Sequence, residues 1–564
     1  MVSGIRLRDL DLCLNLSEML KSVSFFFCYL LMVLYANAQS TGFSRADTLR
    51  GSNGAGRNFW NVLHYDITVN PDIPNKTIIG KNNMRIQIAA AGMLQLDLQE
   101  PMILDKAKTN GQDIPFEREG NVYWLDMGKL TLRDFKFPTI LTLELNFHGM
   151  PREAKLAPWD GGWVWSKDRA QNPWISVACQ GLGASVWYPC KDFQGDEPDQ
   201  GATVRIVVPD SLTGVSNGRL LSITDTLQNK KLYTWKVINP INNYCIVPYI
   251  GKYIHWHEIY KGLKGNLDMD YWALEEDSSK AVKQFEDAPR MMKAFEYWMG
   301  PYPFYEDGYK LVQTSFLGME HQSGIAYGNK FRNGYMGRDL SGTGWGMKWD
   351  FIIVHESGHE WFANNITTED IADMWVHEGF TNYAEVLFTE YYYGKNAGAE
   401  YVRGIRQNIK NDEPITGRYG VNDEGSSDMY YKAANMIHLI RRLINDDAKF
   451  RDMLIAMNSK YYHHVVTAAE IEAFISNCSK LKLGPVFNQY LHTTDIPVFE
   501  YKFSGGKLKY HFTNVVKGFS LKLPITIGEN VKMLTVSEKW KSIIASDSAI
   551  AADADYLVNV RKID

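Results

Sequence analysis

Apolar and polar residues alternate in short runs along the first half of the chain, as they do in half-buried β-strands. The runs are separated by stretches rich in Gly, Pro, Asn and Asp that are typical of turns. The clearest of them read HYDITV, NMRIQIA, TLELNF, TVRIVV and LYTWKV. The pattern predicts an all-β domain over residues 59–255, of a β-sandwich-like kind, preceded by a linker at residues 39–58.

From about residue 256 the spacing of apolar residues becomes helical. The clearest helical segments are SSKAVKQFEDAPRMMKAFEYWMG, WDFIIVHESGHEWFANN and DMYYKAANMIHLIRRLIND. Alternation returns near the C-terminus in FEYKFSGGKLKYHF and GFSLKLPITI. We therefore expect a mainly helical domain at residues 256–490 and a small β domain at residues 491–564, which makes the chain a multidomain α+β protein.

The first residues are typical of a secretory signal. Lys21 precedes an apolar run at residues 23–35, and the small residues of ANAQS follow it. This pattern predicts a signal peptide at residues 1–38 and an exported protein, periplasmic or extracellular, without a stable membrane span after cleavage. Acidic residues before Met19 are atypical of such a signal and favour Met19 as the true start.

Composition narrows the function classes. The 564-residue chain is 45% hydrophobic and 22% charged, which describes a globular protein. Its net charge of -5 offers no basic surface, so we expect no nucleic-acid partner. No C-x-x-C pair suggests a cysteine metal site, and the cysteines left after signal removal are predicted to be mostly buried thiols, with their pairing open. These are Cys179, Cys190, Cys245 and Cys478. The oligomeric state also stays open.

The segment VHESGHEW places ionisable groups in an otherwise apolar helix. His355 and His359 are four residues apart, so their rings lie on one face of the helix. Buried imidazoles and carboxylates are costly unless they are paired or bind a metal. The spacing therefore fits a tetrahedral zinc site in which Glu356 holds a water, although the string also arises by chance. Gly358 has no explanation at this level, because glycine inside a helix costs about 1 kcal/mol relative to alanine.

A third ligand is available in a second predicted helix, DMWVHEGFTNYAEVLF. Glu378 lies in it, and its neighbours Trp375, Phe380 and Tyr383 are not those of a solvated helix face. Two histidines and one glutamate are a known zinc ligand set that leaves a fourth position open for water. Glu385 shares the face of Glu378 and is a candidate for a supporting contact.

With these motifs the sequence resembles the gluzincin aminopeptidases related to aminopeptidase N and the leukotriene-hydrolase aminopeptidases. HExxH is followed after eighteen residues by the glutamate of WVHEGF. LGMEHQ is similar to the family's GAMEN motif, YYKA to its Tyr-x-Lys-Gly, and ACQGLGASVWYPCKD to a β-domain segment that reaches the active site. The resemblance covers roughly residues 59–500 and implies a thermolysin-like catalytic domain with one zinc ion per chain.

The departures from the family pattern are equally specific. Leu317, His321 and Ala433 stand where the family has Gly, Asn and Gly. Backbone geometry and substrate contacts at these places do not carry over from the resemblance. The large C-terminal helical domain of some relatives is not expected in this chain either.

The resemblance, together with the chemistry of the side chains, assigns roles to nine residues. Glu356 would be the general base and Tyr430 the oxyanion donor, with Tyr431 as the alternative. Glu320 would bind a free α-ammonium group, and Gln180 would assist it. The backbone of Gly318 and Met319 would line the substrate groove. The implied zinc ligands are His355, His359 and Glu378.

We therefore expect a zinc aminopeptidase that acts on peptides with a free N-terminus. Two alternatives stay open. The same site chemistry suits a zinc endopeptidase or an epoxide hydrolase, and a catalytically silent peptide-binding protein would keep the fold without the chemistry.

Overall fold

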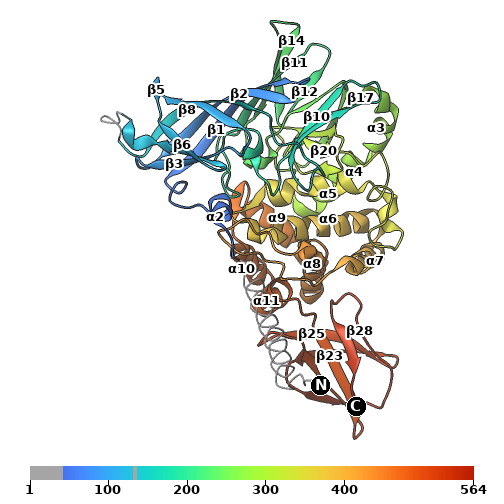
Figure 1. Ribbon diagram of the computed structural model, residues 1–564. Coiled ribbons are helices and arrows are strands. Elements are labelled where there is room, and N and C mark those ends of the chain that lie inside the picture. Colours follow the sequence, from blue (N-terminus) through green and yellow to red (C-terminus); the bar gives the residue numbers. More distant parts are fainter. Residues whose placement is uncertain (1–41, 131–135) are drawn as a thin grey trace, which may run out of the picture. The chain divides into compact units, whose positions relative to one another are not determined.

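The computed structural model describes residues 42–130 and 136–564 (Figure 1). The predicted signal peptide lies outside the described residues. In the described part, no helix is both long enough and apolar enough to cross a membrane. Residues Thr48–Asp564 form one compact unit, and the contacts described below are contacts within it.

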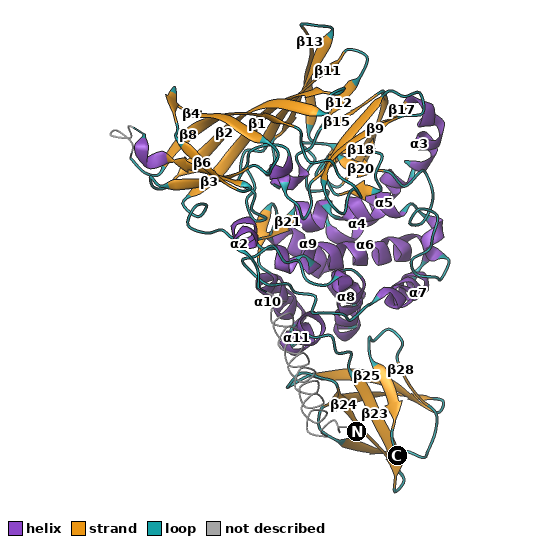
Figure 2. Cartoon of the chain, viewed as in Figure 1, coloured by secondary structure: helices purple, strands orange, loops and turns teal. Residues whose placement is uncertain are grey.

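The N-terminal strands form three sheets, and this confirms the predicted β-rich region (Figure 2). The largest has the order β13-β14-β11-β1-β2-β8-β4-β5, the second β12-β15-β10-β9 and the third β3-β7-β6. The strands are β1 (Trp60–Asp72), β2 (Thr77–Ile88), β3 (Met93–Asp97), β4 (Ile103–Thr109), β5 (Gln112–Asp113), β6 (Phe116–Glu119), β7 (Val122–Asp126), β8 (Thr139–Gly149), β9 (Gly162–Lys167), β10 (Pro173–Ala178), β11 (Ala202–Pro209), β12 (Thr213–Val215), β13 (Arg219–Thr226), β14 (Lys230–Val237) and β15 (Tyr249–Gly251).

Burial along β1 follows the alternation in the sequence. Tyr65, Ile67 and Val69 are fully buried, and the residues between them are partly exposed. β1 pairs antiparallel with β2, with Val69 opposite Gly80, and parallel with β11. The alternating runs thus supply the inner face of the sheet.

The predicted change to helical structure near residue 256 is wrong at its start. Two antiparallel strands, β16 (Tyr253–Gly262) and β17 (Gly265–Leu274), occupy this region, and the first α-helix after them begins at Ser278. In β17, Leu267, Met269 and Tyr271 are buried and alternate with aspartates, which is a strand pattern.

β16 and β17 belong to a five-stranded sheet with the order β16-β17-β18-β20-β19. Its edge strand β19 consists of Gly318–Met319, which lie within the GAMEN-like motif. The other members are β18 (Tyr309–Gln313) and β20 (Ile325–Tyr327).

Helices follow this sheet, as the periodicity predicts. α5 and α6 pack against each other, and α8 also packs on α6 (Figure 1). The side chain of Asp350 caps α5 by accepting from the amides of Ile352 and Ile353. The helices are α3 (Ser278–Gln284), α4 (Asp287–Met299), α5 (Phe351–Gly358), α6 (Trp375–Tyr393), α7 (Lys395–Gly404), α8 (Tyr431–Ile444), α9 (Asp447–Lys460), α10 (Ala468–Ser479) and α11 (Gly484–His492), and the short strands β21 (Ile366–Thr368) and β22 (His464–Val466) pair beside them.

The C-terminal residues form two small sheets, β27-β24-β23-β29 and β26-β25-β28. Their buried residues, such as Phe499 and Leu523, join the apolar core of the helices, and Tyr490 of α11 donates to the carbonyl of Leu557 at 2.7 Å. The predicted β structure at the C-terminus is confirmed. Its strands are β23 (Val498–Ser504), β24 (Lys507–Thr513), β25 (Ser520–Ile527), β26 (Asn530–Ser537), β27 (Lys541–Ile544), β28 (Ile550–Ala552) and β29 (Asn559–Lys562).

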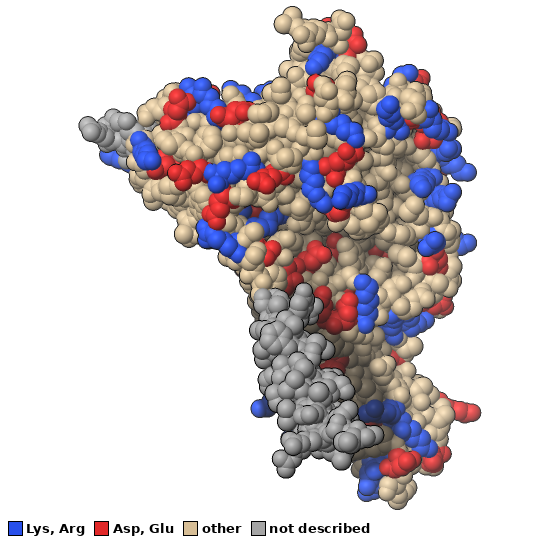
Figure 3. Space-filling model, viewed as in Figure 1, with Lys and Arg blue, Asp and Glu red and all other residues tan. Residues whose placement is uncertain are grey.

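Charged side chains of both signs are interspersed over the visible face (Figure 3), in keeping with the small net charge. The four cysteines of the described part are free thiols. Cys179, Cys190 and Cys245 are buried and Cys478 is half-buried.

Candidate active site

Three predicted metal ligands meet where α5 packs on α6. Nε2 of His355 and Nε2 of His359 lie 3.5 Å and 3.4 Å from the same carboxylate oxygen, Oε2 of Glu378. All three side chains are buried. The two histidines come from the end of α5 and the glutamate from the first turn of α6.

The helix that carries the histidines is shorter than the sequence predicts. α5 ends at Gly358, His359 caps it, and a kink follows at Phe362 and Ala363. Phe362 has φ -130° and Ala363 has φ 136°, so the helix predicted to continue through these residues is interrupted. The kink orients the carbonyl of Phe362 toward Nδ1 of His359, and the two atoms lie 3.0 Å apart.

The second nitrogen of each histidine ring, Nδ1, lies beside an oxygen that can accept a hydrogen bond from it. Nδ1 of His355 lies 2.7 Å from Oε1 of Glu385, and Nδ1 of His359 contacts the Phe362 carbonyl. A carbonyl or carboxylate partner fixes the proton on Nδ1 and leaves the Nε2 lone pair free. Glu385, which the sequence offered as a candidate for a supporting contact, therefore lies against His355.

These residues fit a zinc ion. Oε2 of Glu378 is buried and has no hydrogen-bond partner among the described residues. Burial alone would raise the pKa of Glu378, but His355 and His359 outweigh it and hold the pKa below its ordinary value. Ligands at about 2.0–2.2 Å in a tetrahedral site lie roughly 3.3–3.5 Å apart. The separations around Glu378 match this, so the cluster can hold the metal that its donor set favours.

Close packing of α5 on α6 explains Gly358. A Cβ at this position would lie 3.0 Å from Cγ2 of Thr381 and 3.6 Å from Cβ of Ala384, both on α6. The hydroxyl of Thr381 is also 3.1 Å from Nδ1 of His359. A larger residue at position 358 would therefore push apart the two helices that carry the ligands.

Glu356 lies beside the ligands in a buried position. Burial, opposed by the nearby His355 and His359, raises its pKa to about 7. A Cβ at Gly318 would come within 2.9 Å of Glu356 Oε1, so the glycine keeps this carboxylate uncovered on the side of β19. A carboxylate with a pKa near neutrality suits proton transfer in both directions.

Glu320 joins the N-terminal β region to the metal cluster. Its Oε1 accepts hydrogen bonds from Nε2 of Gln180 at 2.7 Å and from the hydroxyl of Tyr244 at 3.1 Å. Ligand atoms of Glu320, Glu356 and His359 lie within 4.8 Å of one another. Burial raises the pKa of Glu320 above its ordinary value, a cost that a bound cation would remove.

Tyr430 lies next to the cluster, partly buried, just before α8. Its ring stacks over that of His355 with the centroids 6.1 Å apart, and it follows a short turn that ends at Met429. Its neighbour Tyr431 also packs on the core at its edge. The lysine of the same motif, Lys432, points elsewhere and donates to the carbonyl of Thr493 at 2.8 Å.

The departures from the family motifs have physical counterparts. His321 is buried, and its Nδ1 lies 2.6 Å from the hydroxyl of Tyr249, so it braces the turn after Glu320. Ala433 faces Gly379, where a Cβ would lie only 2.7 Å from the alanine Cβ. The small residue of the α6–α8 contact is thus supplied by α6. Leu317 is half-buried and packs on the core.

The structure brings all nine predicted site residues into one region, and it adds some that the motifs did not reveal. Tyr244 supports Glu320, Thr381 supports His359, and Tyr401 donates to Oε2 of Glu385 at 2.6 Å. No spacing rule singles out Tyr244 or Tyr401, because each reaches the site through tertiary packing. Of the three, only Thr381 could have been predicted from the sequence, because it lies three residues after Glu378 and therefore on the same face of that helix.

Comparisons with known proteins agree with this geometry. Residues 284–490 match the peptidase family M1 domain. The chain is 22% identical over 478 residues to leukotriene A-4 hydrolase of Xenopus laevis, covering 79% of this chain and 73% of the relative. It is 21% identical over 504 residues to the probable aminopeptidase 2 of Sulfurisphaera tokodaii, covering 84% of this chain and 60% of the relative.

The fold is shared with a solved structure. The M1 zinc metallopeptidase of Deinococcus radiodurans superposes with a TM-score of 0.66 at 19% identity, covering 78% of this chain and 95% of that one. Residues 284–490 therefore carry a peptidase family M1 domain, and the chain is similar to aminopeptidases and M1 zinc metallopeptidases.

Proposed function

We propose that the protein removes the N-terminal residue from peptides, with one zinc ion per chain held by His355, His359 and Glu378. The observation that carries the proposal is the pairing of two buried features. A three-donor metal cluster lies beside a second carboxylate, Glu320, which is buried and already oriented by Gln180 and Tyr244.

Charge supports this assignment. Three buried carboxylates, Glu320, Glu356 and Glu378, lie at a site where Nδ1 of both histidines faces an acceptor oxygen, which leaves Nε2 directed toward the carboxylates. Buried carboxylates need positive partners. A divalent ion and one substrate ammonium group would balance the three negative charges, whereas a blocked N-terminus would leave one of them uncompensated.

Each of these residues has its own role in the proposed hydrolysis. A zinc ion in the cluster would supply a Lewis acid that polarises the scissile carbonyl and lowers the pKa of water. Glu356 takes a proton from the attacking water and delivers it to the leaving amine. Tyr430 donates to the developing oxyanion, a contact worth about 3 kcal/mol. Glu320, with Gln180, holds the α-ammonium group.

The test compares an aminoacyl anilide that has a free amine with its N-acetylated form. Preference for the free amine is expected, because only that substrate supplies a positively charged group that can pair with the Glu320 carboxylate. Equal rates would overturn the exopeptidase assignment and favour an endopeptidase. Metal analysis of the purified protein, expected to find one zinc per chain, tests the cofactor separately.

Export is a separate part of the proposal. The apolar run at residues 23–35 followed by ANAQS supports it. N-terminal sequencing of the mature protein is expected to begin near Gln39, and a first residue well before it would contradict cleavage there.

A further inference from the structure

A short segment near the N-terminus contacts two loops that both lead to the site. The segment comprises residues Thr48–Ser52, which include the end of α2 (Arg45–Gly51), and we call it the strap. One loop, residues 178–192, follows β10 and carries Gln180. The other, residues 417–425, precedes the turn that ends next to Tyr430. The sequence suggested only a linker here.

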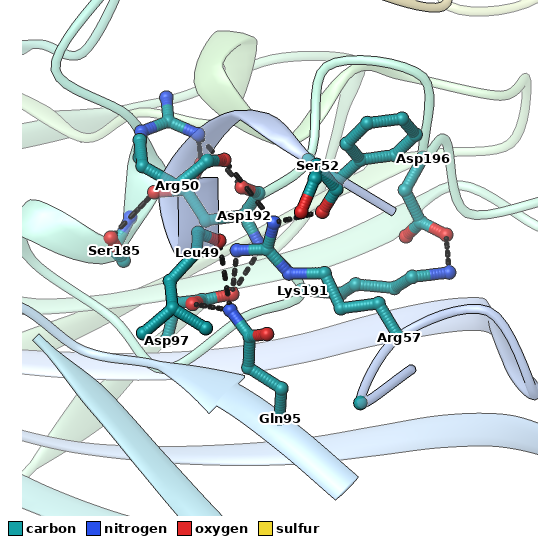
Figure 4. A network of polar contacts seen from close by, with 12 residues as sticks. Leu49, Arg50, Ser52, Arg57, Gln95, Asp97, Ser185, Lys191, Asp192 and Asp196 are labelled. Atoms are coloured by element: carbon teal, nitrogen blue, oxygen red, sulfur yellow. Dashed lines mark hydrogen bonds and ion pairs between the residues drawn. The ribbon is translucent and has the colours of Figure 1, made fainter. Parts of the chain in front are cut away.

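Arg50 is the contact with the Gln180 loop (Figure 4). Its Nε donates to the carbonyl of Leu182 at 3.2 Å, and its NH1 donates to the carbonyl of Asp192 at 2.7 Å. The guanidinium also pairs with the Asp192 carboxylate at 3.3 Å. One side chain thus bridges positions near both ends of the loop.

Hydrogen bonds within the loop connect the residues that Arg50 contacts to Gln180. The amide of Leu182 donates to the carbonyl of Gln180 at 2.7 Å, and the carboxylate of Asp192 accepts from the amide of Ser185 at 3.1 Å. Gln180 in turn donates to Glu320. A continuous chain of hydrogen bonds therefore runs from Arg50 to the carboxylate that we assign to the substrate ammonium group.

Gly51 is the contact with the second loop. A Cβ at Gly51 would overlap the carbonyl group of Val421, so backbone meets backbone at this point. Three residues along, Gly54 is not crowded, since a Cβ there would touch only Ser52 Oγ at 3.4 Å, an ordinary contact. Position 51 therefore needs glycine for close approach and position 54 does not.

A buried arginine fixes the strap itself. NH1 of Arg57 donates to the carbonyls of Arg50 and Ser52 at 3.2 Å and 2.9 Å, and its NH2 donates to Oδ2 of Asp97 at 2.7 Å (Figure 4). Asp97 also accepts from the amide of Asp192 at 2.9 Å. The strap and the Gln180 loop therefore share one polar network, which is costly to break because it is buried.

We propose that the strap is a positioning element for the ammonium site, in which Arg50 holds Gln180 against Glu320 and Gly51 ties this loop to the one that leads to Tyr430. The inference rests on the proposed aminopeptidase function. Its consequence is that a segment outside the M1 domain sets the affinity for a free N-terminus.

Kinetics of Arg50→Ala test the proposal. KM for the free aminoacyl anilide is expected to rise roughly 3- to 30-fold, the range for a substitution that acts through intervening contacts, with a smaller change in kcat and unchanged zinc content. Arg50→Lys should recover part of the loss, since an ammonium group can serve one carbonyl. In a Gln180→Ala background, Arg50→Ala should add less than about twofold, because the two residues act in series. Additive effects would overturn the proposal.

Amide hydrogen exchange gives a readout that does not depend on activity. Arg50→Ala is expected to speed exchange in residues 178–192, and Gly51→Ala to speed it in residues 417–425, while the matched control Gly54→Ala leaves both unchanged. Unchanged hydrogen exchange in Arg50→Ala would overturn the proposal that the strap positions the Gln180 loop. If the wild-type protein cleaves free and N-acetylated substrates equally, the aminopeptidase proposal fails instead, and the exchange result still decides whether the strap holds the loops.

Discussion

The metal cluster and the ammonium site are built in different ways. His355, His359 and Glu378 come from two adjacent helices within one stretch of the M1 domain, and their supports lie on the same helices or in the kink after α5. Glu320 and Gln180 instead meet across 140 positions of sequence. The first is a local property of one helix pair, whereas the second depends on how the β region packs on the catalytic domain. Chemistry and specificity should therefore be separable by mutation.

The largest effect is expected at Glu356. Glu356→Gln keeps the shape of the side chain and removes the proton acceptor, so kcat should fall by about 10²- to 10⁴-fold. Zinc content should not change, because the ligand atoms belong to other residues. Steady-state kinetics with metal analysis checks both, and turnover that survives the substitution would remove Glu356 from the mechanism.

Glu320→Ala addresses the other half of the comparison. Removing a buried acceptor leaves the donors of Gln180 and Tyr244 without their partner, and loss of one member of a buried charged contact costs about 2–5 kcal/mol. We expect kcat/KM for the free aminoacyl anilide to fall by roughly 10²-fold with zinc retained. Loss of zinc would show that the two sites are not separable.

Glu385→Gln tests the support of the metal cluster. The variant keeps an oxygen for Nδ1 of His355 but removes the charge that strengthens this contact. Zinc affinity, measured by competition with a chelator, is expected to fall about 10- to 100-fold. The matched control is Glu390→Gln on the same helix, whose carboxylate pairs with Arg441 and not with a ligand. A similar loss of zinc in this control would mean that helix stability, not the contact with His355, is responsible.

The difference between a metal cluster built on one helix pair and an ammonium site built by packing also determines what could be predicted from the sequence. The histidine spacing and the WVHEGF segment reveal the metal cluster, because helical periodicity alone brings these residues together. The interruption at Phe362 and Ala363 has no such signal, since neither residue is Gly or Pro, and a helix was wrongly expected there. Gln180 was found only through the family resemblance.

Tertiary partners such as Tyr244 were missed, and so was the role of the strap. These contacts exist only once the β region is packed on the catalytic domain, and no pattern of neighbouring residues encodes them. The strands β16 and β17 were missed for a different reason, since the alternation of buried residues and aspartates in β17 was present but was interpreted as part of a helical region.

Tyr244→Phe gives the smallest expected effect and the finest test of the comparison. The substitution removes one neutral donor to Glu320, at 3.1 Å, and keeps the packing of the ring. Such a bond is worth about 0.5–1.5 kcal/mol, so KM for the free aminoacyl anilide should rise roughly 2- to 10-fold, with unchanged zinc affinity. Tyr233→Phe is the control, because its hydroxyl donates to the carbonyl of Leu212 in the β region, at 3.4 Å, and contacts no site residue among the described ones. If Tyr244→Phe instead weakens zinc binding as Glu385→Gln does, the β region supports the metal cluster as well, and the division between a local chemical site and a packing-dependent specificity site is wrong.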